Sequence, residues 1–297
     1  MLHFDGVIRD CLPPRPASAP RRIKVPPGAW ETHAHVIGSS AQYPFVPGRH
    51  FNPPPVSPAD FVTMLDKVGL QFGVVVQVSV HGTDNRLLLK ALREYPDRLC
   101  GVAVIDPTIS DKEIAVLRDA GVRGIRILDI VGGGVGLQNL EVLAKRCAEV
   151  DWHIQVATRG ETYPGLANRL LKLRVPFMID HMGWCAAKNG VDSTEFQAVL
   201  HLVRNSDCYV KLSGGFRLSA QSFPFSDVVP FARTLIETAP DRMVWGSDWP
   251  HVGLYDPSAV PDVGEILDGL ADYADDAEQQ KILVINPTRL YGAPNAT

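Results

Sequence analysis

Apolar and polar positions alternate between two textures along most of the chain. Short runs rich in β-branched and apolar residues, such as "FGVVVQVS", are each followed by a longer segment with helical spacing. Near-continuous apolar runs of this kind are typical of parallel strands that are buried on both faces. The pattern predicts strands at residues 30–36, 72–79, 99–105, 122–128, 153–157, 176–181, 208–213 and 243–248. It predicts helices near residues 58–69, 84–95, 111–120, 137–150, 161–173, 194–205, 226–239 and 263–285, with cap or first-turn signals at Ser57, Thr83, Ser110 and Ser193.

Eight strands that each precede a helix predict the fold class α/β and, within it, a closed (β/α)8 TIM barrel. An open doubly wound sheet usually has fewer strands. No repeat above the βα unit and no linker interrupts the body, so a single domain over residues 29–297 is expected. Residues 1–28 include "CLPPRPASAPRRIKVPPG" and are rich in proline and arginine. They are expected to form an extended N-terminal arm that wraps over the barrel.

Composition narrows the class of protein. The 297 residues are 45% hydrophobic and 21% charged, with a net charge of −4, which argues against nucleic-acid binding as the main task. No apolar run has the length of a membrane span, and the first residues lack the apolar core of a secretory signal. The five cysteines include no CxxC and are expected to be reduced. These features predict a cytoplasmic enzyme without a membrane partner, and leave an oligomer possible.

Chemistry-bearing residues recur where the predicted strands end. In a TIM barrel this end carries the active site. His33 and His35, in "ETHAHV", are two residues apart and would face the same side of a strand. His181 and Asp248 end the sixth and eighth predicted strands. A buried carboxylate such as Asp248 is costly unless it is paired or bound to a metal, so we expect these four side chains to meet in one site.

Further polar residues are predicted to lie near the same mouth. Ser79 and His81 follow the second predicted strand, Arg126 lies within the apolar fourth strand, and Arg217 follows the seventh. An arginine inside an apolar strand favours an inward role in anion binding. Asp180, by contrast, is expected to cap the turn that follows its strand.

With these residues assembled, the chain resembles the amidohydrolase superfamily. The phrases that carry the resemblance are "HAHVIG", "VVVQVSVHGTDN", "GVAVIDP", "GVRGIRI", "IDHMG", "VWGSDWPH" and "NPTRLYG". They extend from Pro26 to Tyr291 and are most similar to the lactonase branch, in particular to the 2-pyrone-4,6-dicarboxylate lactonases. The branch also contains sugar lactonases and a sugar-lactone isomerase.

The resemblance implies roles for individual residues. Asp248 would be the general base, and His33, His35 and His181 would line the reaction centre with it. Arg126, Arg217 and Ser79 would bind a substrate carboxylate or carbonyl, with His81 and Phe51 nearby. The pyrone dicarboxylate lactonases work without metal, so no cofactor is expected to be required. The alternative is one Zn²⁺ or Mn²⁺ held by His33, His35, His181 and Asp248.

Departures from the resembled pattern restrict the substrate. The glycine-rich "VGGGVG" stands where those lactonases place a second arginine, and Phe51 and Ala157 stand in place of tyrosines. The expected reaction is therefore hydrolysis of a carboxylate-bearing lactone of the pyrone, muconolactone or sugar-acid type, with fewer carboxylates than the pyrone dicarboxylate or a different shape. Three alternatives remain: a metal-dependent non-oxidative decarboxylase, a lactone isomerase, and a catalytically silent binding protein.

Overall fold

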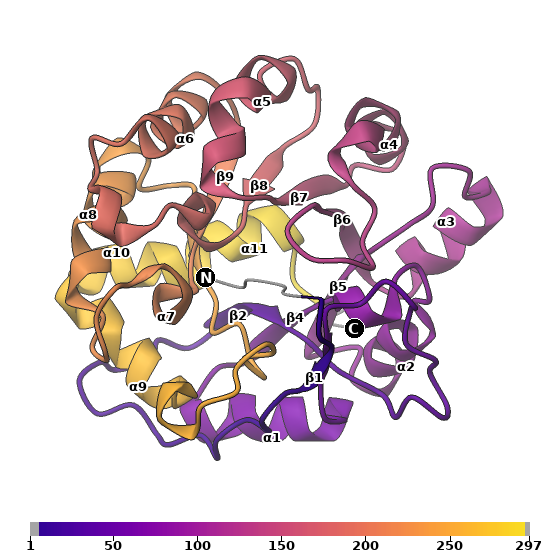
Figure 1. Ribbon diagram of the computed structural model, residues 1–297, viewed down its shortest axis with the longest axis horizontal. Helices are drawn as coiled ribbons and strands as arrows, with labels where there is room; N and C mark the ends of the chain where they lie inside the picture. Colours follow the sequence, from indigo (N-terminus) through magenta and orange to yellow (C-terminus); the bar gives the residue numbers. More distant parts are fainter. Residues whose placement is uncertain (1–5, 295–297) are drawn as a thin grey trace.

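Eight parallel strands form the centre of the protein in a computed structural model that describes residues 6–294. In the order in which they pair, they are β2 (Trp30–Ala34), β4 (Phe72–Val76), β5 (Leu99–Ala103), β6 (Val122–Leu128), β7 (His153–Ala157), β8 (Phe177–Ile179), β9 (Cys208–Leu212) and β10 (Met243–Trp245). Helices surround these strands on the outside (Figure 1). The predicted TIM barrel is confirmed.

The barrel closes between β2 and β10 through a short set of hydrogen bonds. The Thr32 hydroxyl donates to the Trp245 carbonyl at 2.7 Å, and the Asp248 backbone N–H donates to the His33 carbonyl at 2.8 Å. The His35 N–H donates to the Trp249 carbonyl at 2.8 Å. Residues predicted for the active site therefore also form the closing seam of the fold.

The outer ring contains α1 (Pro58–Val68), α2 (Arg86–Glu94), α3 (Asp111–Asp119), α4 (Leu140–Ala148), α5 (Tyr163–Leu170), α6 (Thr194–Asn205) and α8 (Val229–Thr238). Ser57 and Ser110 each accept a hydrogen bond from the third helical N–H within a capping box, as the sequence indicates. Ser193 occupies the N-cap position of α6 without a side-chain bond, and α2 begins after Asn85 rather than at Thr83. The helix predictions are otherwise close to the observed bounds.

The predicted long helix over 263–285 is wrong, because the chain breaks there into α9 (Val263–Asp268), α10 (Asp276–Gln280), a π-helical turn over Lys281–Ile285 and α11 (Asn286–Tyr291). In Figure 1, α11 lies inside the ring of outer helices. Its Tyr291 ring stacks on Trp30 at 5.8 Å and contacts His153 edge-on at 5.2 Å. The C-terminal helix thus covers the end of the barrel where the strands begin, and His153 lies at that end as its position in the sequence suggests.

The N-terminal arm packs on its own barrel over the described part of residues 6–28. Arg9–Asp10 (β1) pair with Phe51–Asn52 (β3) in a small parallel sheet. The Asp262 carboxylate accepts from the Ser18 N–H at 3.0 Å, and Asp268 accepts from the N–H groups of Arg21, Arg22 and Ile23 at 2.7–3.2 Å. Residues 1–5 of the predicted arm and 295–297 of the predicted domain lie outside the described residues, and the division at residue 28 stays a prediction.

All five cysteines are buried free thiols, as predicted. Among the helices of residues 6–294, none is long and apolar enough to cross a membrane. The cytoplasmic location stays a prediction.

Candidate active site

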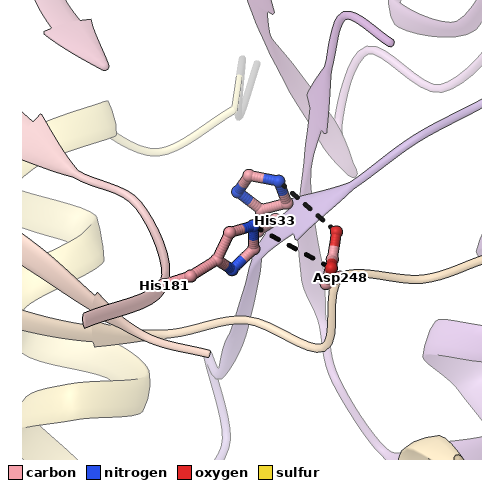
Figure 2. A group of neighbouring side chains, drawn as sticks. All are labelled: His33, His181 and Asp248. Carbon is pink, nitrogen blue, oxygen red and sulfur yellow. Dashed lines mark ion pairs between the residues drawn. The ribbon is translucent and has the colours of Figure 1, made fainter. Parts of the chain in front are cut away.

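Three imidazoles converge on one carboxylate where the strands end. The Nε2 atoms of His33, His35 and His181 lie 3.7, 3.6 and 3.9 Å from the nearer carboxylate oxygen of Asp248. Figure 2 shows His33, His181 and Asp248 pointing toward one another from separate parts of the chain. All four side chains are buried. The structure therefore brings together the four residues that the sequence indicates, although they are far apart along the chain.

The backbone at these positions departs from ordinary strand geometry. A register shift between Glu31 and Ala34 marks a bulge in β2 beside the two histidines. His181 has φ 51° and Asp248 has φ 63°, a left-handed conformation that is unfavourable for side chains with a Cβ. Each such residue costs about 1–3 kcal/mol, which the surrounding fold must offset. Unfavourable backbone at two residues of one site indicates that their side-chain positions matter more than local stability.

Glu31 connects the two sides of the closing seam beneath these histidines. Its buried carboxylate accepts from the His33 N–H at 2.8 Å and from the Ser247 N–H at 2.9 Å. Burial raises its pKa from 4.5 to about 7, against the lowering effect of these hydrogen bonds. Sequence reasoning did not single out Glu31, although an acidic residue between Trp30 and the HxH pair was the available signal.

Asp248 is ion-paired with Arg217, whose Nε donates to Oδ2 while its Nη2 donates to the Val252 carbonyl at 3.0 Å. Burial would raise the pKa of Asp248, but the guanidinium and the neighbouring imidazoles outweigh burial and hold it well below the usual value. Asp248 is therefore a carboxylate throughout the neutral range. Arg217 was expected to bind a substrate carboxylate, and its first partner in the structure is Asp248.

The expectation that Asp180 caps a turn is wrong. Its side chain makes no capping hydrogen bond, and its carboxylate instead lies 3.1 Å from Arg126 Nε, 3.2 Å from Lys211 Nζ and 3.5 Å from His33 Nδ1. Burial opposes ionisation of Asp180, yet Lys211, His33 and Arg126 hold its pKa well below the usual value. The physical reason is that two buried cations, Arg126 on β6 and Lys211 on β9, need a counter-charge, and Asp180 follows β8, which lies between these two strands.

Lys211 is the second functional candidate that sequence reasoning missed. It lies near the C-terminal end of β9, fully buried, and its pKa is lowered to about 8, chiefly by burial and against the effect of Asp180. A lysine in the apolar run "CYVKLS" is the same kind of signal that identified Arg126.

The imidazoles of the site have different partners. Burial lowers the pKa of His181 to about 4 and that of His33 well below its usual value. His35 Nδ1 lies 2.7 Å from the Val76 carbonyl oxygen, and His181 Nδ1 lies 2.8 Å from the Ser213 hydroxyl. Gly214 packs so closely on His181 that a Cβ there would lie 2.9 Å from the ring, and its φ of 69° also favours glycine. Neutral rings can donate or accept one hydrogen bond each, which suits stabilisation of a developing oxyanion.

A cavity opens beside this group with a largely apolar wall. Phe51, Ser79, Arg126 and Arg217 line it, as the sequence predicts for substrate contacts. The rest of the lining is formed by His35, Val78, Leu128, Ile130, Val131, His181, Trp184, Asp248 and Val252. His81 does not line it, contrary to expectation. The single 3₁₀ turn at Ser79–His81 directs that ring to within 6.0 Å of Tyr43 and 5.8 Å of Phe45, where it is buried.

His33, His181 and Asp248 also form a group whose ligand-type atoms all lie within 4.8 Å of one another. This spacing is compatible with a metal ion, and His35 is not part of the group.

The family model described as "Amidohydrolase" matches residues 30–293. The chain belongs to the amidohydrolase family. A 4-sulfomuconolactone hydrolase of Rhizobium radiobacter is 37% identical to it over 96% of this chain and 97% of that protein. A 2-pyrone-4,6-dicarboxylate hydrolase of Comamonas testosteroni is 38% identical over 91% and 92%. A D-galactarolactone isomerase of Agrobacterium fabrum is 31% identical over 90% and 91%. The resemblance read from the sequence motifs is confirmed at the level of the family and of its lactone-converting members.

Proposed function

We propose that this amidohydrolase opens the ring of a small carboxylate-bearing lactone by adding water to the ring carbonyl. The observation that carries the proposal is the convergence of three Nε2 atoms within 4 Å of Asp248 at the C-terminal end of the barrel. The names of similar proteins support it, since two are hydrolases of lactones or pyrones.

Asp248 is suited to move the proton in this reaction. Its carboxylate accepts a proton from water as the water oxygen bonds to the carbonyl carbon. The ring C–O bond then breaks, and the same proton passes from Asp248 to the departing oxygen. His181, which lines the cavity, and His33, whose Nε2 faces Asp248, would donate hydrogen bonds to the carbonyl oxygen as negative charge develops on it.

The substrate's carboxylate is expected to bind at Arg126. The Nε of Arg126 donates to Asp180, while the terminal guanidinium nitrogens of Arg126 have no hydrogen-bond partner among residues 6–294. Ser79 lines the same cavity and can add a hydroxyl donor. The other arginine of the cavity, Arg217, is already paired with Asp248. Leu128, Ile130 and Val131 add an apolar wall that offers nothing to a second acidic group. We therefore propose a lactone with one acidic group near Arg126.

The charges around His33, His181 and Asp248 do not suit a divalent metal ion. Arg217 donates to one oxygen of Asp248, and the Lys211 ammonium lies 2.8 Å from the other ring nitrogen of His33. A metal bound here would lie among cations in a buried site, where repulsion is strong. We propose that the reaction requires no metal, which also disfavours the metal-dependent decarboxylase.

A lactone isomerase is the second candidate, because the Agrobacterium relative carries that name. In that reaction a hydroxyl of the substrate would replace water as the attacking group, with the same residues in place. Product NMR separates the two reactions, since hydrolysis gives an open-chain acid and isomerisation gives a second lactone.

The decisive experiment is a substrate screen with a matched pair of variants. Muconolactone-type, pyrone-type and sugar-acid lactones with none, one and two carboxylates are tested with and without chelator. We expect the highest kcat/KM for a lactone with one carboxylate, no effect of the chelator, and a loss of about 10²–10⁴-fold in kcat for Asp248→Asn. Asp192→Asn, which changes an exposed carboxylate, is the control. Full activity of Asp248→Asn would refute the proposal, and activity abolished by the chelator would refute its metal-free part.

A further inference from the structure

Lys211 occupies an unusual position for a lysine. It is fully buried near the C-terminal end of β9, and its side chain extends inside the barrel to His33 and Gln155. Burying an ammonium group is expensive unless its hydrogen bonds and charge are satisfied. It lines no part of the cavity beside Asp248, so contact with the substrate does not account for it.

The surroundings of Lys211 match the three N–H donors of an ammonium group. Nζ lies 2.8 Å from His33 Nδ1, 2.7 Å from Gln155 Oε1 and 3.2 Å from Asp180 Oδ1. These three acceptors come from three other strands or strand ends. Nζ therefore hydrogen-bonds to His33 and Gln155 and forms an ion pair with Asp180, so its protons and its charge are directed at groups of the protein.

This arrangement determines which nitrogen of His33 carries the proton. An ammonium group can only donate, so Nδ1 of His33 must accept with its lone pair. In the neutral ring the proton is then on Nε2. That atom is buried, has no hydrogen-bond partner among the described residues, and faces Asp248 across 3.7 Å. We infer that Lys211 is a positioning residue, which holds His33 in the Nε2–H form so that it donates a hydrogen bond into the reaction centre.

In the neighbouring His35 the donor and acceptor nitrogens are the reverse of those in His33. The Nδ1 of His35 lies 2.7 Å from the Val76 carbonyl oxygen, which can only accept, so Nδ1 must carry the proton. In the tautomer with its proton on Nδ1, His35 presents a lone pair at Nε2. Two histidines one residue apart thus divide two tasks, with His33 as donor and His35 as acceptor, because their partners at Nδ1 differ.

The donor form of His33 has two consequences that rest on the proposed lactone reaction. His33 can stabilise the oxyanion formed when water attacks the ring carbonyl, and it cannot serve as a metal ligand through Nε2 while that proton remains. Replacing Lys211 should therefore weaken catalysis more than substrate binding, and should make the group around Asp248 more receptive to zinc.

The direct test is ¹⁵N NMR of the histidine rings in selectively labelled protein, with His33→Gln to assign the signals. Wild-type protein is expected to show His33 protonated at Nε2. Lys211→Met is expected to release Nδ1, which can then donate to Asp180, and to lower kcat by about 10²–10³-fold, the usual effect of losing one oxyanion donor, with KM nearly unchanged. Zinc titration should show tighter binding to Lys211→Met than to wild type. Lys188→Met, at an exposed lysine, is the control.

The outcomes are distinguishable from failure of the proposed function. A wild-type His33 protonated at Nδ1 overturns the inference, even if Lys211→Met fails to fold. A Lys211→Met protein with an unchanged His33 ring or with an equal change in kcat and KM also overturns it. If His33 carries the Nε2 proton but no lactone is converted, the proposed function fails while the assignment stands.

Discussion

Glu31→Gln is the substitution whose effect on stability follows most directly from the structure. The Glu31 side chain is fully buried and joins β2 to the loop after β10 by accepting from the N–H groups of His33 and Ser247. A glutamine has nearly the same shape, and its carbonyl oxygen can still accept these bonds. The main change is that the ionisable group disappears from the seam.

The magnitude follows from the raised pKa of Glu31, which is about 7 in the folded protein and 4.5 as its ordinary value. Between these two values the folded state binds more protons than the unfolded state. The free energy of unfolding of the wild type therefore falls as pH rises through this window. At 1.36 kcal/mol for each unit of pKa difference, the loss is about 3 kcal/mol once the pH is above 7. Glu31→Gln cannot titrate and escapes this loss.

The assay is urea unfolding of both proteins at pH 5, 6, 7 and 8. The difference in stability between variant and wild type should move in favour of the variant by about 2.5 kcal/mol from pH 5 to pH 8, since part of the loss has already occurred at pH 5. Glu161→Gln, which changes an exposed glutamate, should show a flat difference. A flat difference for Glu31→Gln as well would mean that Glu31 is not buried as a costly charge, and the account of the seam would be wrong.

Three further predictions concern the anion site, the arm and the buried histidines. Arg126→Lys keeps the charge but loses the free terminal nitrogens, so KM for a one-carboxylate lactone should rise about 10-fold or more in steady-state kinetics, and an unchanged KM would place the carboxylate elsewhere. Asp268→Ala removes the acceptor for three arm N–H groups, so limited proteolysis should cut within residues 6–28 faster than in wild type, and equal rates would show that the arm is held by other contacts. Burial lowers the pKa of His153 to about 3, so the folded protein keeps this ring neutral while the unfolded chain protonates it below about pH 6.5. The free energy of unfolding therefore falls as the pH drops from 6.5 toward 3. His153→Gln should therefore make the free energy of unfolding less steep with pH by up to about 1.4 kcal/mol per unit between pH 4 and 6, and an unchanged slope would show that His153 is not buried neutral.

The repeating βα pattern predicted the barrel well because periodicity and burial are local properties of the chain. The predicted strand ends were too long, since β4, β8 and β10 stop at Val76, Ile179 and Trp245. The residues that follow them turn out of the sheet to face the cavity, and a polar side chain does not reveal that change of direction. The prediction of one helix over residues 263–285 was wrong for a different reason. The apolar spacing of this segment suited one long helix, whereas contact with Trp30 and His153 places Tyr291 on a separate short helix.

Among the site residues, Asp248 and the three histidines that converge on it could be predicted, because each lies at or near the end of a predicted strand and strand ends meet at one mouth of a barrel. The partners of Arg126 and Arg217 could not be predicted from the sequence. Sequence shows that a buried cation needs a counter-charge, but it does not show that Asp180 and Asp248 supply it rather than a substrate. For Lys211 the sequence does contain a signal, a lysine within the apolar run "CYVKLS", but it was not used to predict a site residue.

A chain of hydrogen bonds inside the barrel links the covering helix to the reaction centre, and its members have a fixed direction. The Tyr291 hydroxyl contacts the Met178 sulfur and accepts from Gln155 Nε2 at 3.0 Å, which turns Gln155 Oε1 toward Lys211. Lys211 in turn donates to His33 Nδ1, which leaves the proton of His33 facing Asp248. Reversing one of these bonds would leave a buried donor facing a donor, at a cost of about 1–3 kcal/mol. These buried polar groups therefore relate the orientation of Tyr291 and Gln155 to the proton of His33, the ring that we propose as a hydrogen-bond donor to the substrate.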